Sequence, residues 1–61
     1  MSHKPIGTAT LDHQVTTIRK YENGHYTVEA NGDVKYFSES LEELEKKLRN
    51  DGITHSVFDR N

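Results

Sequence analysis

The chain contains no cysteine at all and only one proline among its 61 residues. Without cysteine it cannot build a disulfide framework or a thiolate zinc site, which suits a reducing cytoplasm. No apolar run approaches the roughly 20 residues that a membrane-spanning helix needs. The first 13 residues also lack the apolar centre of a secretory signal. We therefore expect a cytoplasmic protein that has no membrane contact.

The signatures of an enzyme are also missing. The glycines stand where turns and a helix end are expected, so they do not form a phosphate-binding loop. No nucleophile motif surrounds any serine, and the carboxylates gather on the predicted helix, where ion pairing accounts for them. The four histidines do not have the spacing of metal ligands. We therefore expect no catalytic residue, metal, cofactor or small-molecule substrate.

The chain also lacks a clear excess of basic residues, since its formal net charge is −2. Domains that rely on phosphate contacts are usually basic, so this balance argues against nucleic acid as the main partner. Only 31% of the residues are hydrophobic, and the length is near the lower limit for a fold with a single core. Self-association is one common remedy for so small a core.

Two Asn-Gly dipeptides are the strongest indication of β-structure in this sequence. Asn23-Gly24 and Asn31-Gly32 lie eight residues apart, and apolar and polar residues alternate around them. Asn-Gly within such alternation is typical of a β-hairpin. We expect three strands, and residues 1–13, which show no apolar period, as a poorly ordered tail before one domain of residues 14–61. The predicted strands cover 14–21, 25–29 and 33–37.

Burial of the apolar side chains favours one register for the second hairpin. A three-residue loop over 30–32 pairs Val28 with Val34 and Tyr26 with Tyr36, and requires Gly32 to be left-handed. A two-residue turn at Asn31-Gly32 would instead split the apolar set between the two faces. In the first hairpin, a three-residue loop over 22–24 pairs Ile18 with Val28 and Lys20 with Tyr26, while a two-residue turn that pairs Tyr21 with Tyr26 stays open. The core face then comprises Ile18, Tyr26, Val28, Val34, Tyr36, Leu41, Leu44 and Leu48.

The segment SLEELEKKLRNDG, residues 40–52, predicts a helix. Ser40 and Glu43 have the spacing of a capping box, and leucines at 41, 44 and 48 share one face. Acidic residues precede basic ones at i, i+4, and Gly52 is placed to end the helix in the left-handed conformation. Residues 53–58 are expected to extend back towards the sheet, and the sequence leaves open whether they form a fourth strand. The expected fold is α+β: a three-stranded antiparallel β-meander with one helix packed on one face.

The other face of that sheet is available to a partner. Aromatic and basic side chains alternate on it, a pattern that some domains use to stack single-stranded bases and pair phosphates. Exposed apolar patches are also typical of protein interfaces. We therefore expect a small non-enzymatic regulatory protein that acts through protein–protein contacts, as a homodimer or with another protein, and keep nucleic-acid binding as the alternative. The predicted partner-binding residues are Arg19, Tyr21, His25, Lys35 and Phe37.

The order of a strand, an Asn-Gly turn, the sequence GHYTV, a further strand and a helix that begins SLEEL covers residues 18–50. In this order the chain resembles small antitoxin domains of the HicB type. It is also similar to three-stranded DNA-binding domains at the N-terminus of some phage-type integrases, although those are usually basic and this chain is not. The resemblance implies a phage or plasmid accessory protein, and it assigns no functional residue.

Overall fold

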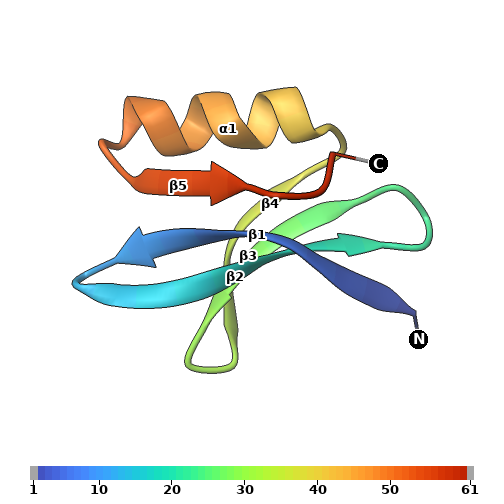
Figure 1. The fold of residues 1–61 in the computed structure, drawn as a ribbon, viewed down its shortest axis with the longest axis horizontal. Coiled ribbons are helices and arrows are strands. Elements are labelled where there is room, and N and C mark those ends of the chain that lie inside the picture. Colours follow the sequence, from blue (N-terminus) through green and yellow to red (C-terminus); the bar gives the residue numbers. More distant parts are fainter. Residues whose placement is uncertain (1, 61) are drawn as a thin grey trace.

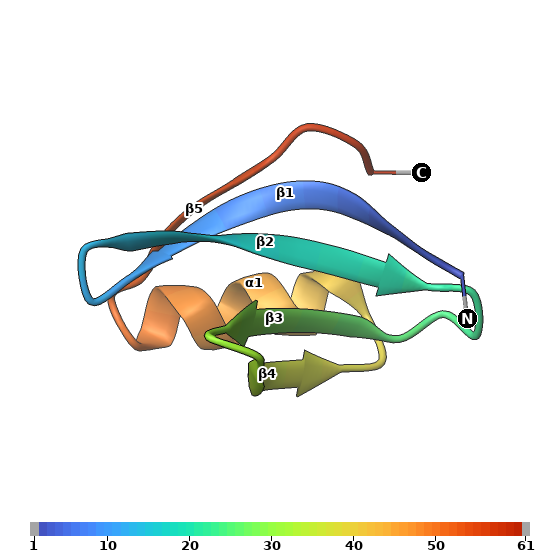
Figure 2. The ribbon, with the colours of Figure 1, turned by 90° about the horizontal axis from the view of Figure 1, so that it is seen from below.

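A computed structural model describes residues 2–60 as one five-stranded antiparallel sheet and one helix (Figure 1). The α+β class is confirmed, but the sheet has five strands where three were predicted. The strand order is β4-β3-β2-β1-β5, so β4 and β5 are the edges. Seen from below, the strands follow one another in this order and α1 lies along one face (Figure 2). The elements are β1 (His3–Leu11), β2 (Gln14–Tyr21), β3 (Tyr26–Ala30), β4 (Asp33–Ser38), α1 (Leu41–Asn50) and β5 (Thr54–Val57).

The prediction of a disordered tail over residues 1–13 is wrong, because His3–Leu11 form β1; Met1 lies outside the described residues. β1 pairs with β2 along its whole length, and a bulge at Ile6 shifts the register between Pro5 and Gly7. The bulge explains why no period was visible: it lets Ile6 and Ala9, three residues apart, both enter the core. The domain therefore begins well before residue 14.

The C-terminal segment also joins the sheet. β5 pairs with β1 from the opposite side to β2, with Gly7 opposite Val57 and Thr10 opposite Thr54. This settles the question of residues 53–58, since their central part forms the fifth strand. The carbonyl of Ile6 accepts hydrogen bonds from the backbone N–H groups of Phe58 and Asp59, at 2.9 and 3.2 Å. The bulge in β1 thus also anchors the chain beyond β5.

The first predicted hairpin has the expected register. Ile18 pairs with Val28 and Lys20 with Tyr26, as a three-residue loop requires. The Tyr21 N–H donates to the carbonyl of His25 at 2.8 Å, and Gly24 has a φ of 89°. The open two-residue alternative is excluded.

The predicted register of the second hairpin is wrong. Ala30 pairs with Asp33 across a two-residue turn, in which Asn31 and Gly32 both have positive φ. A bulge then skips Lys35, so that Val28 pairs with Tyr36 and Glu29 with Val34. The left-handed Gly32 is confirmed, but Val34 lies on the outer face and is 55% exposed. The bulge allows the tight turn and still brings Tyr36 to the core face. A prediction that assumes strict alternation of side chains along the strand cannot produce this register.

Both ends of α1 follow the expected capping rules. The Glu43 N–H donates to the Ser40 hydroxyl at 3.1 Å, as predicted. The Glu43 carboxylate does not return to the Ser40 N–H; it accepts from the Ser38 hydroxyl, whose oxygen accepts from that N–H. At the other end, Gly52 has a φ of 71°, and two backbone hydrogen bonds, Gly52 to Arg49 and Ile53 to Leu48, close a Schellman motif.

The core lies between α1 and the sheet. The fully buried side chains come from β1, β2, β3 and α1, and most of the predicted core residues are buried or half-buried among them. Val34 is the exception. The members outside the eight predicted positions come from β1, from β5 and from Ile53, which directly precedes β5. The core cluster comprises Ile6, Ala9, Ile18, Val28, Leu44 and Leu48, with Leu11, Tyr26, Tyr36, Leu41, Ile53 and Val57 packed against it.

Candidate functional site

The face of the sheet that α1 leaves uncovered, here called the outer face, carries most of the predicted partner-binding residues. Arg19 pairs across the sheet with Thr27, and Thr27 pairs with Phe37. These three therefore share a rung, with Tyr21 and His25 beyond it on the side of the first hairpin. Lys35 falls in the bulge of β4 and belongs to no rung. The structure thus brings four of the five predicted residues to one face, and Lys35 stands apart from them.

Glu29 occupies the centre of the outer face and organises its polar groups. Its side chain is only 20% exposed and lies 2.9 Å from the Arg19 guanidinium. The other carboxylate oxygen accepts from the Tyr21 hydroxyl at 2.8 Å and from the Thr27 hydroxyl at 3.4 Å. The carboxylate therefore takes up the charge of the one arginine on this face.

Glu29 is not among the partner-binding residues that the sequence predicts. The diagonal from Arg19 to Glu29 across β2 and β3 is within reach of long side chains once the register is known. The correctly predicted pairing of Ile18 with Val28 therefore contained the signal.

Tyr21 is held on both sides. The hydrogen bond that its hydroxyl donates to Glu29 raises the pKa of Tyr21 above its usual value of 10.0, and Arg19 partly opposes this. The ring also lies 5.0 Å from that of His3, which β1 brings alongside. Tyr21 thus has a defined structural role in joining β1, β2 and β3.

The aromatic pair at the β4 end of the outer face is formed by His25 and Phe37. Their ring centroids are 4.9 Å apart and meet edge to face at 61°. Tyr21 does not take part in this pair, because its ring packs against that of His3. Phe37 is still 48% exposed, so the pair presents apolar surface to solvent.

The strand β4 combines this exposed surface with a sheet edge. Val34 and Phe37 pair with Glu29 and Thr27, which alternate along β3, so both side chains lie on the outer face. Part of the edge is already occupied: the Lys47 ammonium donates to the Phe37 carbonyl at 2.8 Å. The Tyr36 hydroxyl donates to the Asp51 carboxylate from the other side of the strand. The Phe37 carbonyl therefore already has a hydrogen-bond donor at this edge of the sheet.

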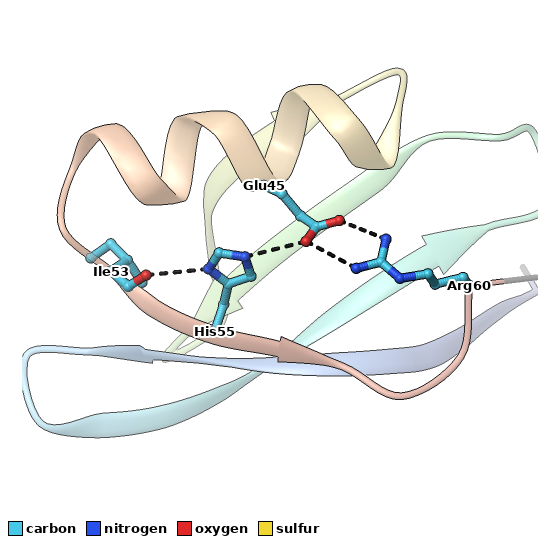
Figure 3. A network of polar contacts seen from close by, with 4 residues as sticks. All are labelled: Glu45, Ile53, His55 and Arg60. Carbon is cyan, nitrogen blue, oxygen red and sulfur yellow. Dashed lines mark hydrogen bonds and ion pairs between the residues drawn. The ribbon is translucent and has the colours of Figure 1, made fainter.

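A second polar cluster lies away from this face, where α1, β5 and the C-terminal segment meet (Figure 3). Two nitrogens of the Arg60 guanidinium donate to the two carboxylate oxygens of Glu45, at 2.9 and 3.2 Å. The His55 Nε2 lies 3.4 Å from the same carboxylate, and its Nδ1 lies 3.3 Å from the Ile53 carbonyl oxygen. The bidentate hydrogen bond from Arg60 lowers the pKa of Glu45, against an opposing effect of burial.

This cluster corrects the view of two residues. The i, i+4 charge pattern of the predicted helix pairs Glu45 with Arg49, and the spacing of the histidines assigns no role to His55. The side chains of Glu45 and His55 are only 13% and 12% exposed, and they hold each other across the edge of the core. No local pattern in the sequence signals this cluster, because its members come from segments that only the fold brings together.

Other kinds of site receive little support from the geometry. A hollow of about 270 Å³ adjoins the first hairpin, below the roughly 300–1,000 Å³ of typical small-molecule pockets. Its lining residues are Ser2, His3, Lys4, Lys20, Tyr21 and Glu22. Residues 2–60 contain no group of three or more side chains placed to hold a metal ion. Over the same span, α1 is too short and too polar to cross a bilayer.

The five-stranded sheet departs from the three-stranded integrase domains that residues 18–50 resemble in sequence order. Comparison with known proteins adds no family to this picture: no family model, curated protein or solved structure matches the chain significantly.

Proposed function

We propose that this chain is a small non-enzymatic interaction protein that self-associates through the outer face at β4. The observation that carries the proposal is the exposure of Val34 and Phe37, at 55% and 48%, on one face of an edge strand. Burial of apolar surface contributes about 25 cal/mol per Å² removed from water, so such a patch favours association. A twofold arrangement of two copies would bring the same patch of each chain together.

The small core supports the same proposal. Among residues 2–60, six side chains make up the buried hydrophobic cluster, and the apolar side chains packed against it are partly buried. A domain with so little buried surface has a narrow margin over the loss of chain entropy on folding. Association through β4 would add buried area at a strand that contributes none of the six buried side chains of the core cluster.

The alternative function is binding of single-stranded nucleic acid on the same face. The pair of His25 and Phe37 offers rings on which a base could stack, and Lys35 could contact a phosphate. Glu29 weighs against it, because its carboxylate already neutralises Arg19 and would repel phosphates near the centre of the face. The protein-contact hypothesis is therefore preferred.

The deciding experiment measures the solution mass of the chain over a concentration series, at low and high salt. A dimer held by apolar contacts should persist or strengthen at high salt. Val34→Lys and Phe37→Lys should shift the midpoint of dimerisation to at least tenfold higher concentration. Val15→Lys is the matched control, because Val15 is 73% exposed but lies at the far end of β2.

Two results would contradict the proposal. One is a monomer at every concentration, and the other is a dimer that Val15→Lys weakens as much as Phe37→Lys does. A parallel series with a single-stranded oligonucleotide tests the alternative. Binding that falls steeply with salt and is lost in Arg19→Ala or Lys35→Ala would favour nucleic acid.

A further inference from the structure

We infer that Asn31 is a site of spontaneous deamidation and that it converts ahead of Asn23. Both residues precede a glycine in an exposed turn, so the local sequence alone predicts similar rates of deamidation for the two. The two turns differ in how they hold the reacting groups. This inference is independent of the proposed function, because it concerns the chemistry of the turns alone.

The reaction needs only water. The backbone nitrogen of the glycine attacks the side-chain carbonyl carbon of the asparagine, which forms a C–N bond and a five-membered succinimide ring. The bond from that carbon to the side-chain nitrogen breaks, and ammonia leaves. Water then opens the ring at either carbonyl and leaves aspartate or isoaspartate. Glycine favours the attack because it has no Cβ to shield its nitrogen.

In the first turn, both reacting groups are restrained. The Gly24 N–H donates to the Tyr21 carbonyl at 2.9 Å, so the attacking nitrogen is held in a hydrogen bond of the turn. The Asn23 side-chain oxygen accepts from the His25 N–H at 3.2 Å, which fixes the position of the carbonyl carbon. Ring closure at Asn23 requires that both hydrogen bonds break.

In the second turn, neither restraint is present. Within residues 2–60, the Gly32 N–H donates no turn hydrogen bond, and the Asn31 side chain has no hydrogen-bond partner. Asn31 is exposed and has a φ of 53°, in the left-handed region that asparagine adopts more readily than most residues. Rotation of the Asn31 side chain towards the Gly32 nitrogen therefore breaks no hydrogen bond.

The products would alter the β3–β4 connection. Aspartate at position 31 adds a negative charge two residues before Asp33. Isoaspartate also lengthens the backbone by one carbon within a two-residue turn that sets the pairing of Ala30 with Asp33. The second product should therefore disturb the register of β4 more than the first.

The test follows both sites in one sample. The folded chain is incubated in mildly alkaline buffer, and aliquots are cut with a protease that cleaves after glutamate. Because Glu22, Glu29 and Glu39 flank the turns, the two asparagines fall in separate fragments, residues 23–29 and 30–39. Mass spectrometry should detect the replacement of the side-chain NH₂ by OH several-fold sooner in the fragment 30–39 than in the fragment 23–29.

Two controls assign the cause. In denaturant the hydrogen bonds of the first turn are lost, so both fragments should convert at similar rates. Asn31→Gln should abolish the early signal, because the longer side chain does not close a five-membered ring. The inference is overturned if the fragment 23–29 converts first or equally fast in the folded chain. It is also overturned if Asn31 keeps the same lead in denaturant, or if Asn31 converts only there.

Discussion

At Gly7 the lack of a side chain determines how closely two strands approach. A Cβ built on this residue would lie 2.3 Å from the carbonyl oxygen of Ser56 and 3.0 Å from the Cα of Val57. Both atoms belong to the backbone of β5, so no rotation of a side chain can relieve the contact. Gly7 is therefore required for β5 to pair with β1 at this point.

Gly7→Ala should destabilise the fold by ~1–3 kcal/mol, because the added methyl group overpacks the strand pair. Denaturant unfolding, followed by circular dichroism, measures the loss. Thr8→Ala, the next residue in β1, is the control and should cost less than Gly7→Ala, because it removes side-chain atoms and creates no clash with the backbone of β5. Equal midpoints for Gly7→Ala and the parent would show that β5 lies farther from β1 than described.

At the scale of the element, α1 has its two ends specified by local contacts. Ser40 accepts the Glu43 N–H at the start, and Gly52 permits the left-handed end. Its interior charges do not pair with each other as expected. Lys47 reaches β4, and Glu45 reaches β5 and the C-terminal segment. The helix therefore gains more from contacts across the fold than from pairs along its own surface.

Ser40→Ala should cost ~0.5–2 kcal/mol, because the first turn loses a hydrogen-bond acceptor. In a domain of this size each kcal/mol lowers the melting temperature by roughly 4–8 °C. Ser40→Asp keeps an acceptor at the same position and should retain most of the stability. If the melting temperature of Ser40→Ala equals that of the parent, the helix must be capped by another residue, and Ser38 has the nearest hydroxyl.

At the scale of the whole molecule, the cluster of Glu45, His55 and Arg60 joins three segments around one carboxylate (Figure 3). It closes the side of the core where the short strand β5 lies beside α1 (Figure 1). The lowered pKa of Glu45 means that the folded state prefers the ionised carboxylate. A group with a lowered pKa stabilises the fold above its unfolded pKa, and this contribution is lost as the pH falls through the folded value.

Glu45→Gln should therefore be less stable than the parent at neutral pH, and the gap should shrink in acid. The window lies below the usual glutamate value of 4.5, because the folded pKa is the lower of the two. Denaturant unfolding at a series of pH values measures the gap. Glu39→Gln changes an exposed position before the helix, so its free energy of unfolding should vary with pH in the same way as that of the parent. A gap between Glu45→Gln and the parent that is constant with pH would show that the Glu45 charge is not the source of stability.

Local rules were sufficient for the parts of this protein whose contacts are close in sequence. The caps at Ser40 and Gly52, the helix face and the register of the β2–β3 hairpin all depend on residues within about ten positions of each other. The α+β class follows from them, because one helix with an apolar face must cover one face of the sheet.

The tertiary structure alone decided the rest. The bulges at Ile6 and Lys35 break the period of two, so β1 carried no visible pattern and Val34 changed face. The short strand β5 becomes stable only through its pairing with β1, which is more than 40 residues away in the sequence. The partners of Glu29 and Glu45 depend on these strand positions, because a carboxylate takes the nearest donors in space. The sequence by itself therefore determined the local elements, while the packing of distant segments determined which charges pair and which apolar side chains stay exposed.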